Sequence, residues 1–138
     1  MSILADRLLV VEGDACLRGF LTRVLVEWGY AVKAVPDSQE AIESLDSSPF
    51  SLCLIDAVLP DGSGIDLCRR IRSFGHRGPL VIACREKGDQ DLATNAGADA
   101  CVRMGAFVAH QLQVVLIRLI GMGWESERPV MCYAQPGG

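Results

Sequence analysis

Lysine is scarce in this sequence. Its 138 residues include 13 Lys+Arg, and only Lys33 and Lys87 are lysines. A site that needs a lysine ammonium therefore has two candidates. The sequence also lacks an apolar run of the ~18 residues needed to span a bilayer. No glycine-rich phosphate loop follows the first apolar run, which disfavours a nucleotide- or flavin-binding enzyme.

The charge and hydropathy of the chain indicate one globular domain. The formal net charge is −4, and half of the residues are hydrophobic. This hydrophobic content excludes a disordered chain. The negative charge argues against a stand-alone partner of nucleic acid or of an anionic membrane.

The sequence has six cysteines, at positions 16, 53, 68, 84, 101 and 132, and no C-x-x-C pair. Those at positions 53, 84 and 101 lie in apolar runs. Free cysteine behaves as a small hydrophobe. Together with the lack of a signal-peptide pattern, this leads us to expect reduced core thiols and a cytoplasmic protein.

Short apolar runs alternate with helical patterns along the chain. The runs predict buried parallel strands at 7–12, 30–35, 51–56, 80–84 and 100–103. The helical patterns cover about 14–28, 37–45, 64–74, 90–96 and 108–120. Five strand–helix pairs predict a doubly wound α/β fold with a five-stranded parallel sheet. We expect a domain at 1–121 and a tail or linker at 122–138.

Local signals refine the expected helices. Gly29 is expected to end the first helix, and Asp37 with Glu40 forms a capping-box pattern for the second. The fifth helix is apolar nearly all round. It is either buried in the core or offers an apolar face to a partner.

Asp56 stands directly after an apolar strand and begins the segment IDAVLPDGSGIDLCRRIR. Ligands of open α/β sheets bind at the carboxyl ends of the strands, where this acid would lie. The segment resembles the phosphoacceptor loop of the response-regulator receiver domain of two-component signalling. LLVVEGDACLRGFL and GADACVRMGAF are similar to two further receiver segments, so the resemblance covers about residues 7–120.

The resemblance implies a role for several strand-end residues. Asp56 would accept a phosphoryl group from a histidine kinase. Mg²⁺ would be held by Asp56, by the acidic loop at Glu12 and by the backbone carbonyl of Val58. The family also uses a hydroxyl at the end of the fourth strand that follows the phosphoryl group, and a lysine at the end of the fifth strand that neutralises it.

Four positions depart from the family pattern. Gly13 replaces an acid that ligates the metal, Cys84 replaces the hydroxyl, Cys101 replaces an aromatic residue, and Met104 replaces the lysine. Asp14 either caps the first helix or belongs to the acidic pocket. We therefore expect Mg²⁺ binding to be weak or absent.

Two arginines stand beside the altered positions. Arg85 follows Cys84, and Arg103 precedes Met104. A guanidinium could hold an anion through its planar fork, or it could project to solvent.

These features favour an atypical receiver domain that acts mainly as a protein-interaction module with a degraded phosphorylation site. One alternative is a receiver that still accepts a phosphoryl group on Asp56. Another is a small-molecule enzyme of flavodoxin-like fold. The expected partner is a protein, either a histidine kinase or a downstream target. The fourth helix, fifth strand and fifth helix could form a homodimer face.

Overall fold

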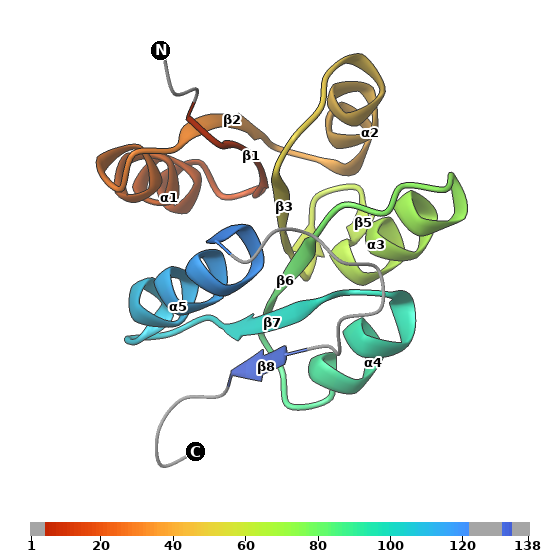
Figure 1. The fold of residues 1–138 in the computed structure, drawn as a ribbon. Helices are drawn as coiled ribbons and strands as arrows, with labels where there is room; N and C mark the ends of the chain where they lie inside the picture. The colour runs from red at the N-terminus through yellow and green to blue at the C-terminus, as the bar shows by residue number, and fades with distance from the viewer. Residues whose placement is uncertain (1–4, 122–130, 134–138) are drawn as a thin grey trace.

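The computed structural model describes residues 5–121 and 131–133, which contain a parallel sheet covered by helices on both faces (Figure 1). The strands of this sheet are β1 (Arg7–Val11), β2 (Ala31–Val35), β3 (Leu52–Asp56), β6 (Leu80–Cys84), β7 (Ala100–Arg103) and β8 (Met131–Tyr133). The helices are α1 (Ala15–Glu27), α2 (Ser38–Ser47), α3 (Gly64–Ser73), α4 (Asp89–Ala96) and α5 (Val108–Gly121). The five predicted strands, the five predicted helices and the doubly wound α/β fold are confirmed.

The strand order creates a crevice at the carboxyl edge of the sheet. The order is β2-β1-β3-β6-β7-β8, and all neighbouring strands are parallel. The chain moves outward from β1 to β2 and then returns to the other side of β1 with β3. This reversal is the place where ligands bind in open α/β sheets. Glu12 and Asp56 lie at the ends of these two central strands.

Alternate residues of the strands build two separate cores. Leu9 of β1 and Ile55 of β3 belong to the core under α2, α3 and α4. Leu8 and Leu54 belong to the core under α1 and α5. Successive side chains of a strand point to opposite faces of the sheet. Because helices cover both faces, every residue of such a strand faces a core, and the strands are continuously apolar.

The helix ends follow the predicted signals. The Asp37 side chain accepts a hydrogen bond from Glu40 N (2.9 Å) and caps α2. Gly29 follows α1 with a φ of 97°, a conformation that favours glycine. In α5, Leu112 and Leu116 are buried while Ile117 is 60% exposed, so this helix both fills the core and presents apolar surface.

Two features were not predicted. The loop after β3 folds into a short antiparallel hairpin, β4 (Val58–Leu59) with β5 (Gly62–Ser63). Met131–Tyr133, which the sequence pattern placed in a tail or linker, pairs with β7 as a sixth strand. Such short segments show no periodicity from which a strand can be predicted.

None of the described helices is both long enough and apolar enough to cross a bilayer. The free thiols are those of Cys16, Cys53, Cys68, Cys84 and Cys101. Four of them, at positions 53, 68, 84 and 101, are buried, as the sequence predicts.

Gly64 holds α3 against the end of β3. A Cβ at this position would lie 1.9 Å from the Asp56 carbonyl oxygen. We expect Gly64→Ala to lower the free energy of unfolding by at least about 1–3 kcal/mol, because the backbone must shift. A Cβ at Gly19, inside α1, would meet no atom within 4 Å beyond its own helix, so Gly19→Ala should raise stability by about 0.5–1 kcal/mol. Urea denaturation of both variants measures the contrast, and equal effects would contradict it.

Candidate functional site

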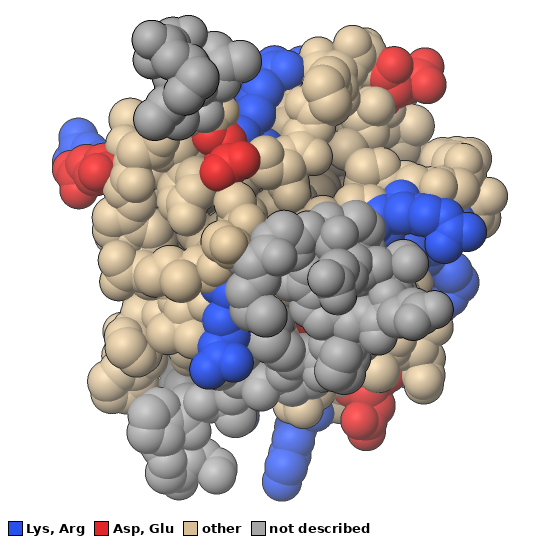
Figure 2. All heavy atoms as spheres, in the orientation of Figure 1, with Lys and Arg blue, Asp and Glu red and all other residues tan. Residues whose placement is uncertain are grey.

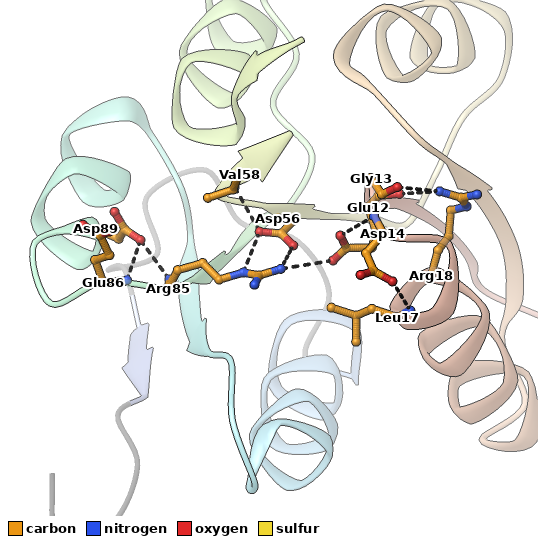
Figure 3. A network of polar contacts seen from close by, with 10 residues as sticks. All are labelled: Glu12, Gly13, Asp14, Leu17, Arg18, Asp56, Val58, Arg85, Glu86 and Asp89. Atoms are coloured by element: carbon orange, nitrogen blue, oxygen red, sulfur yellow. Dashed lines mark hydrogen bonds and ion pairs between the residues drawn. The ribbon is translucent and has the colours of Figure 1, made fainter. Parts of the chain in front are cut away.

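The Asp56 carboxylate lies at the end of β3 and is held by a guanidinium. Arg85 Nε donates to Asp56 Oδ1 at 3.1 Å, and Arg85 Nη2 donates to Oδ2 at 2.5 Å (Figure 3). Val58 N also donates to Oδ1 at 3.0 Å. The Asp56 side chain is 1% exposed and that of Arg85 is 39% exposed. Both carboxylate oxygens are therefore engaged by partners within the protein.

Of the two arginines singled out in the sequence, Arg85 is the one that enters the site. It follows β6, the strand beside β3, and its side chain extends to Asp56 (Figure 3). Arg103 ends β7, where its backbone N–H donates to Gln111 Oε1 at 2.9 Å. Met104 packs against the core under α1 and α5.

Glu12 is the third member of the site. It follows β1 and is 2% exposed. Its Oε1 lies 4.0 Å from Arg85 Nη2, and its Oε2 accepts a hydrogen bond from Asp14 N at 3.1 Å. The strand order thus brings together two acids from adjacent strands, as their positions in the sequence indicate.

The two carboxyl groups have opposite pKa shifts. Burial, followed by a hydrogen bond to Asp56, raises the pKa of Glu12 to about 8. Burial opposes ionisation of Asp56 too, but hydrogen bonds with Glu12 and Arg85 outweigh it and hold the pKa of Asp56 below its usual value. The two shifts therefore favour the proton on Glu12 and the negative charge on Asp56, which is paired with Arg85.

Asp14 caps α1. Its Oδ1 accepts a hydrogen bond from Leu17 N at 3.0 Å, so the capping alternative is confirmed. The adjoining loop is held by Arg18, whose Nη1 donates to the carbonyl oxygens of Glu12 (2.8 Å) and Gly13 (3.3 Å). Sequence reasoning missed Arg18, because a helical arginine reaching back to a preceding loop resembles any solvated charge.

Gly13 is packed against the loop that follows β3. A Cβ at Gly13 would lie 2.7 Å from Pro60 Cδ. Contacts this short require a neighbour to move, and a proline ring adapts poorly. An acidic side chain at this position is thus opposed by the packing as well as missing from the sequence.

Two thiols occupy the positions where the family has a hydroxyl and an aromatic residue. Cys84 is 5% exposed and Cys101 is 2% exposed, both in the core under α2, α3 and α4. A hydrogen bond with Cys101 lowers the pKa of Cys84. The pair fills this part of the core without supplying the strong donor that a hydroxyl provides.

Asp89 fixes the backbone from which Arg85 extends. Its Oδ2 accepts hydrogen bonds from Arg85 N at 2.8 Å and from Glu86 N at 2.9 Å. Asp89 is the first residue of α4, so one carboxylate closes the loop between β6 and this helix (Figure 3). The sequence places Asp89 at the start of an expected helix, which is a signal for a role at the helix end. Its hydrogen bonds to residues that precede the helix could not be predicted.

The donor set does not fit Mg²⁺ as it is arranged. Mg²⁺ prefers octahedral oxygen ligands that include ionised carboxylates. Here burial raises the pKa of Glu12 to about 8, and Asp56 faces a guanidinium. Within the described residues, no group of three or more His, Cys, Asp and Glu side chains is arranged to hold a metal ion. In the metal set expected from Glu12, Asp56 and Val58, Arg85 therefore occupies both oxygens of the central carboxylate.

The raised pKa of Glu12 predicts a pH-dependent stability. The pKa of the Glu12 carboxyl group is 4.5 in its ordinary state and about 8 in the folded protein. Between these two pH values the folded state keeps a proton that the unfolded state releases. This group therefore contributes stability that is lost as the pH rises through this window. Glu12→Gln, which stays neutral, should gain thermal stability relative to the unmodified protein as the pH rises from 5 to 8.

Thermal denaturation across this pH range measures the difference. Glu27→Gln, which removes an exposed carboxyl group on α1, controls for the general loss of a negative charge. A gap between Glu12→Gln and the unmodified protein that stays constant with pH would contradict the assignment.

The bonds from Asp89 predict a positioning effect on Arg85. Asp89→Ala should accelerate solvent exchange of the Arg85 Nε proton, because the backbone from which the side chain extends loses its anchor. Asp91→Ala removes the same charge from the first turn of α4 and should leave that proton unchanged. NMR of the guanidinium groups measures both, and equal exchange in the two variants would contradict the role of Asp89.

Comparison with known proteins identifies the family of this chain. The family model described as "Response regulator receiver domain" matches residues 8–104. The two-component response regulator PhoP of Pseudomonas aeruginosa is 42% identical over 95 residues, which are 67% of this chain and 42% of that protein. The transcriptional regulatory protein CseB of Streptomyces avermitilis is 30% identical over 134 residues, which are 94% of this chain and 57% of that protein. The chain thus spans about half the length of these curated relatives.

Solved structures show the same fold. The receiver domain of sensor histidine kinase PA1611 from Pseudomonas aeruginosa PAO1, solved with a magnesium ion in its active-site cleft, has a TM-score of 0.77 and 27% identity. The alignment covers 86% of this chain and 99% of that one. Receiver domains are regulatory phosphoacceptor domains rather than enzymes in the usual sense. The matched family, the relatives and the Asp56 site together show that this chain belongs to the response-regulator receiver domains of two-component signalling.

Proposed function

We propose that this receiver domain is a protein-interaction module whose function does not depend on phosphorylation. The observation that carries the proposal is the two-point ion pair between Arg85 and Asp56. The domain would present a constant surface to its partner, since its acceptor carboxylate already has a counter-ion within the protein.

The ion pair opposes phosphoryl transfer at the nucleophile. A carboxylate attacks phosphorus with an oxygen lone pair, and the reacting atoms must approach in line. Oδ2 of Asp56 is bonded to Arg85 Nη2, while Oδ1 accepts from both Arg85 Nε and Val58 N. An incoming donor would have to break charge-assisted hydrogen bonds at a side chain that is 1% exposed.

The charge of the site also opposes metal binding. The charge of Asp56 is paired with that of Arg85, and the raised pKa of Glu12 disfavours a second anion beside them. A divalent cation would have to deprotonate Glu12 and displace Arg85. In the family pattern Mg²⁺ and lysine are recruited around an open acidic pocket, whereas this chain supplies the compensating cation itself.

A protein is the partner that the surface supports best, either a histidine kinase or a downstream target. The net charge of −4 disfavours nucleic acid. On the face drawn in Figure 2, the described basic side chains and the described acidic side chains form small groups that lie apart from one another. We place the domain in the cytoplasm, where its free thiols would stay reduced.

One observation favours a second candidate, a receiver that still accepts a phosphoryl group. The Arg85 side chain is 39% exposed, so its guanidinium has room to move from Asp56 onto a phosphoryl oxygen. A planar fork binds phosphate in two-point geometry, and Arg85 would then replace the missing lysine.

Incubation with Mg²⁺ and acetyl phosphate, followed by intact mass measurement, tests the proposal. We expect no phosphoryl adduct on the unmodified protein. In Arg85→Gln, the Asp56 carboxylate loses its clamp, and Mg²⁺ should bind at least ten-fold more tightly by isothermal titration. The reason is that removing the guanidinium leaves a negative site.

Two further outcomes assign the alternatives. A stoichiometric adduct on the unmodified protein that Asp56→Asn abolishes would overturn the phosphorylation-independent function. If Arg85→Gln abolishes the same adduct, the arginine-assisted receiver is the correct function. Arg70→Gln, which removes an exposed arginine on α3, is the matched control for charge.

A further inference from the structure

Two buried thiols lie on adjacent strands near the carboxyl edge of the sheet. Cys84 is the last residue of β6, and Cys101 lies within β7, which pairs with β6 in parallel. The register partner of Cys101 is Ile82, which precedes Cys84 by two residues. Because side chains alternate along a strand, Cys84 and Cys101 point to the same face of the sheet. Both thiols accordingly belong to the core under α2, α3 and α4.

The two sulfur atoms lie close together within this core. Cys84 Sγ lies 3.9 Å from the carbonyl oxygen of Ile82, so this thiol leans back along β6 to the level of Cys101. The thiols of Cys84 and Cys101 form a hydrogen bond with one another. Cys101 Sγ also lies 4.0 Å from the carbonyl oxygen of Gln90, in the first turn of α4. The pair is thus a pre-formed contact between two strands.

Cys84 differs from other buried thiols of the same core in its acidity. Burial raises the pKa of Cys53 and that of Cys68. A hydrogen bond with Cys101 instead lowers the pKa of Cys84. The thiolate is the form that reacts with oxidants. Within the pair, Cys84 is also the more accessible thiol, 5% exposed against 2% for Cys101. We therefore take Cys84 as the thiol that reacts first.

We propose that Cys84 and Cys101 form a reversible disulfide when hydrogen peroxide oxidises the domain, and that this bond releases Arg85 from Asp56. The Cys84 sulfur attacks one peroxide oxygen, the O–O bond breaks, and a sulfenic acid and one water are formed. The Cys101 sulfur then attacks the Cys84 sulfur, and the sulfenic oxygen leaves as a second water. The two thiols together lose two hydrogen atoms and two electrons, which reduce the peroxide.

The strand order couples this bond to the ion pair. β6 lies between β3, which carries Asp56, and β7, which carries Cys101. Diagonal neighbours on two strands have Cα atoms about 7–8 Å apart, whereas a disulfide needs about 4.4–6.8 Å. The bond therefore draws the end of β6 toward β7 and away from β3. Arg85 directly follows Cys84, so its guanidinium withdraws from Asp56.

The disulfide is a transient modification. Thiol exchange with a small reductant such as glutathione restores both cysteines, as is usual for redox-sensing disulfides of the cytoplasm. The inference rests on the proposed function in one respect, since it concerns the same ion pair between Arg85 and Asp56. It adds the chemical condition under which that pair opens.

Peroxide treatment of the full chain tests the disulfide, with intact mass and peptide mapping without reduction as the measurements. We expect the loss of two hydrogen atoms, a linked pair of peptides that contain Cys84 and Cys101, and complete reversal by dithiothreitol. Cys84→Ala and Cys101→Ala should each prevent this bond. Cys68→Ala, which removes another buried thiol of the same core, should leave it unchanged.

NMR of the oxidised protein tests the release of the guanidinium. The Nε proton of Arg85 should exchange about ten-fold faster once its bond to Asp56 is lost. The amide of Ala57 donates to a β6 carbonyl oxygen at 3.0 Å, near the carboxyl edge, and should also exchange faster. The amide of Cys53 donates at 3.0 Å to the carbonyl oxygen just before β6 and should stay protected. In Cys84→Ala, peroxide should change none of the three.

The possible failures point to different parts of the inference. Oxidation of the exposed Cys16 without a bond between Cys84 and Cys101 would overturn the modification site. A bond from Cys101 to Cys132, its register partner on β8, would overturn the pairing. A disulfide that leaves the Arg85 proton unchanged would overturn the release. These measurements involve no phosphoryl transfer, whereas a phosphoryl adduct on the reduced protein would overturn the proposed function alone.

Discussion

The ion pair between Asp56 and Arg85 is the interaction on which the rest of the site depends. A carboxylate that is 1% exposed is costly to bury as an anion unless a cation and hydrogen bonds compensate it. Arg85 supplies both through its planar fork. Burial, followed by a hydrogen bond with Asp56, raises the pKa of Glu12 to about 8. The charge of Asp56 is thereby balanced by Arg85 within the protein.

The same ion pair links three loops at the carboxyl edge of the sheet. Glu12 belongs to a loop that Arg18 holds through two carbonyl oxygens, and Arg85 extends from a loop that Asp89 closes. Each loop is tied by a charged side chain to backbone groups, so the site is supported by many local hydrogen bonds. In a receiver that switches, the loop after β6 must be able to move, because it contacts the phosphoryl group. Here the salt bridge of Arg85 with Asp56 at one end and the Asp89 carboxylate at the other hold that loop.

Residues at strand ends could be placed from the sequence, and contacts between distant loops could not. Alternating apolar runs and helices predict a parallel sheet, and a parallel sheet brings Glu12 and Asp56 to one edge. Asp14 as a cap is also a local signal. The direction of the Arg85 side chain was left open, because a long flexible side chain beside an acid can equally well face solvent. The contact of Gly13 with Pro60 joins segments distant in the chain, and β8 depends on an available strand edge rather than on its own sequence.

A crystal structure grown with Mg²⁺ and beryllium fluoride tests the central claim most directly. Beryllium fluoride mimics a phosphoryl group on an acceptor aspartate, and its binding requires an open carboxylate and a metal. The account predicts that Arg85 stays on Asp56 and that neither ion is bound there. Beryllium fluoride on Asp56, with Mg²⁺ between Glu12 and Asp56 and Arg85 displaced, would contradict it.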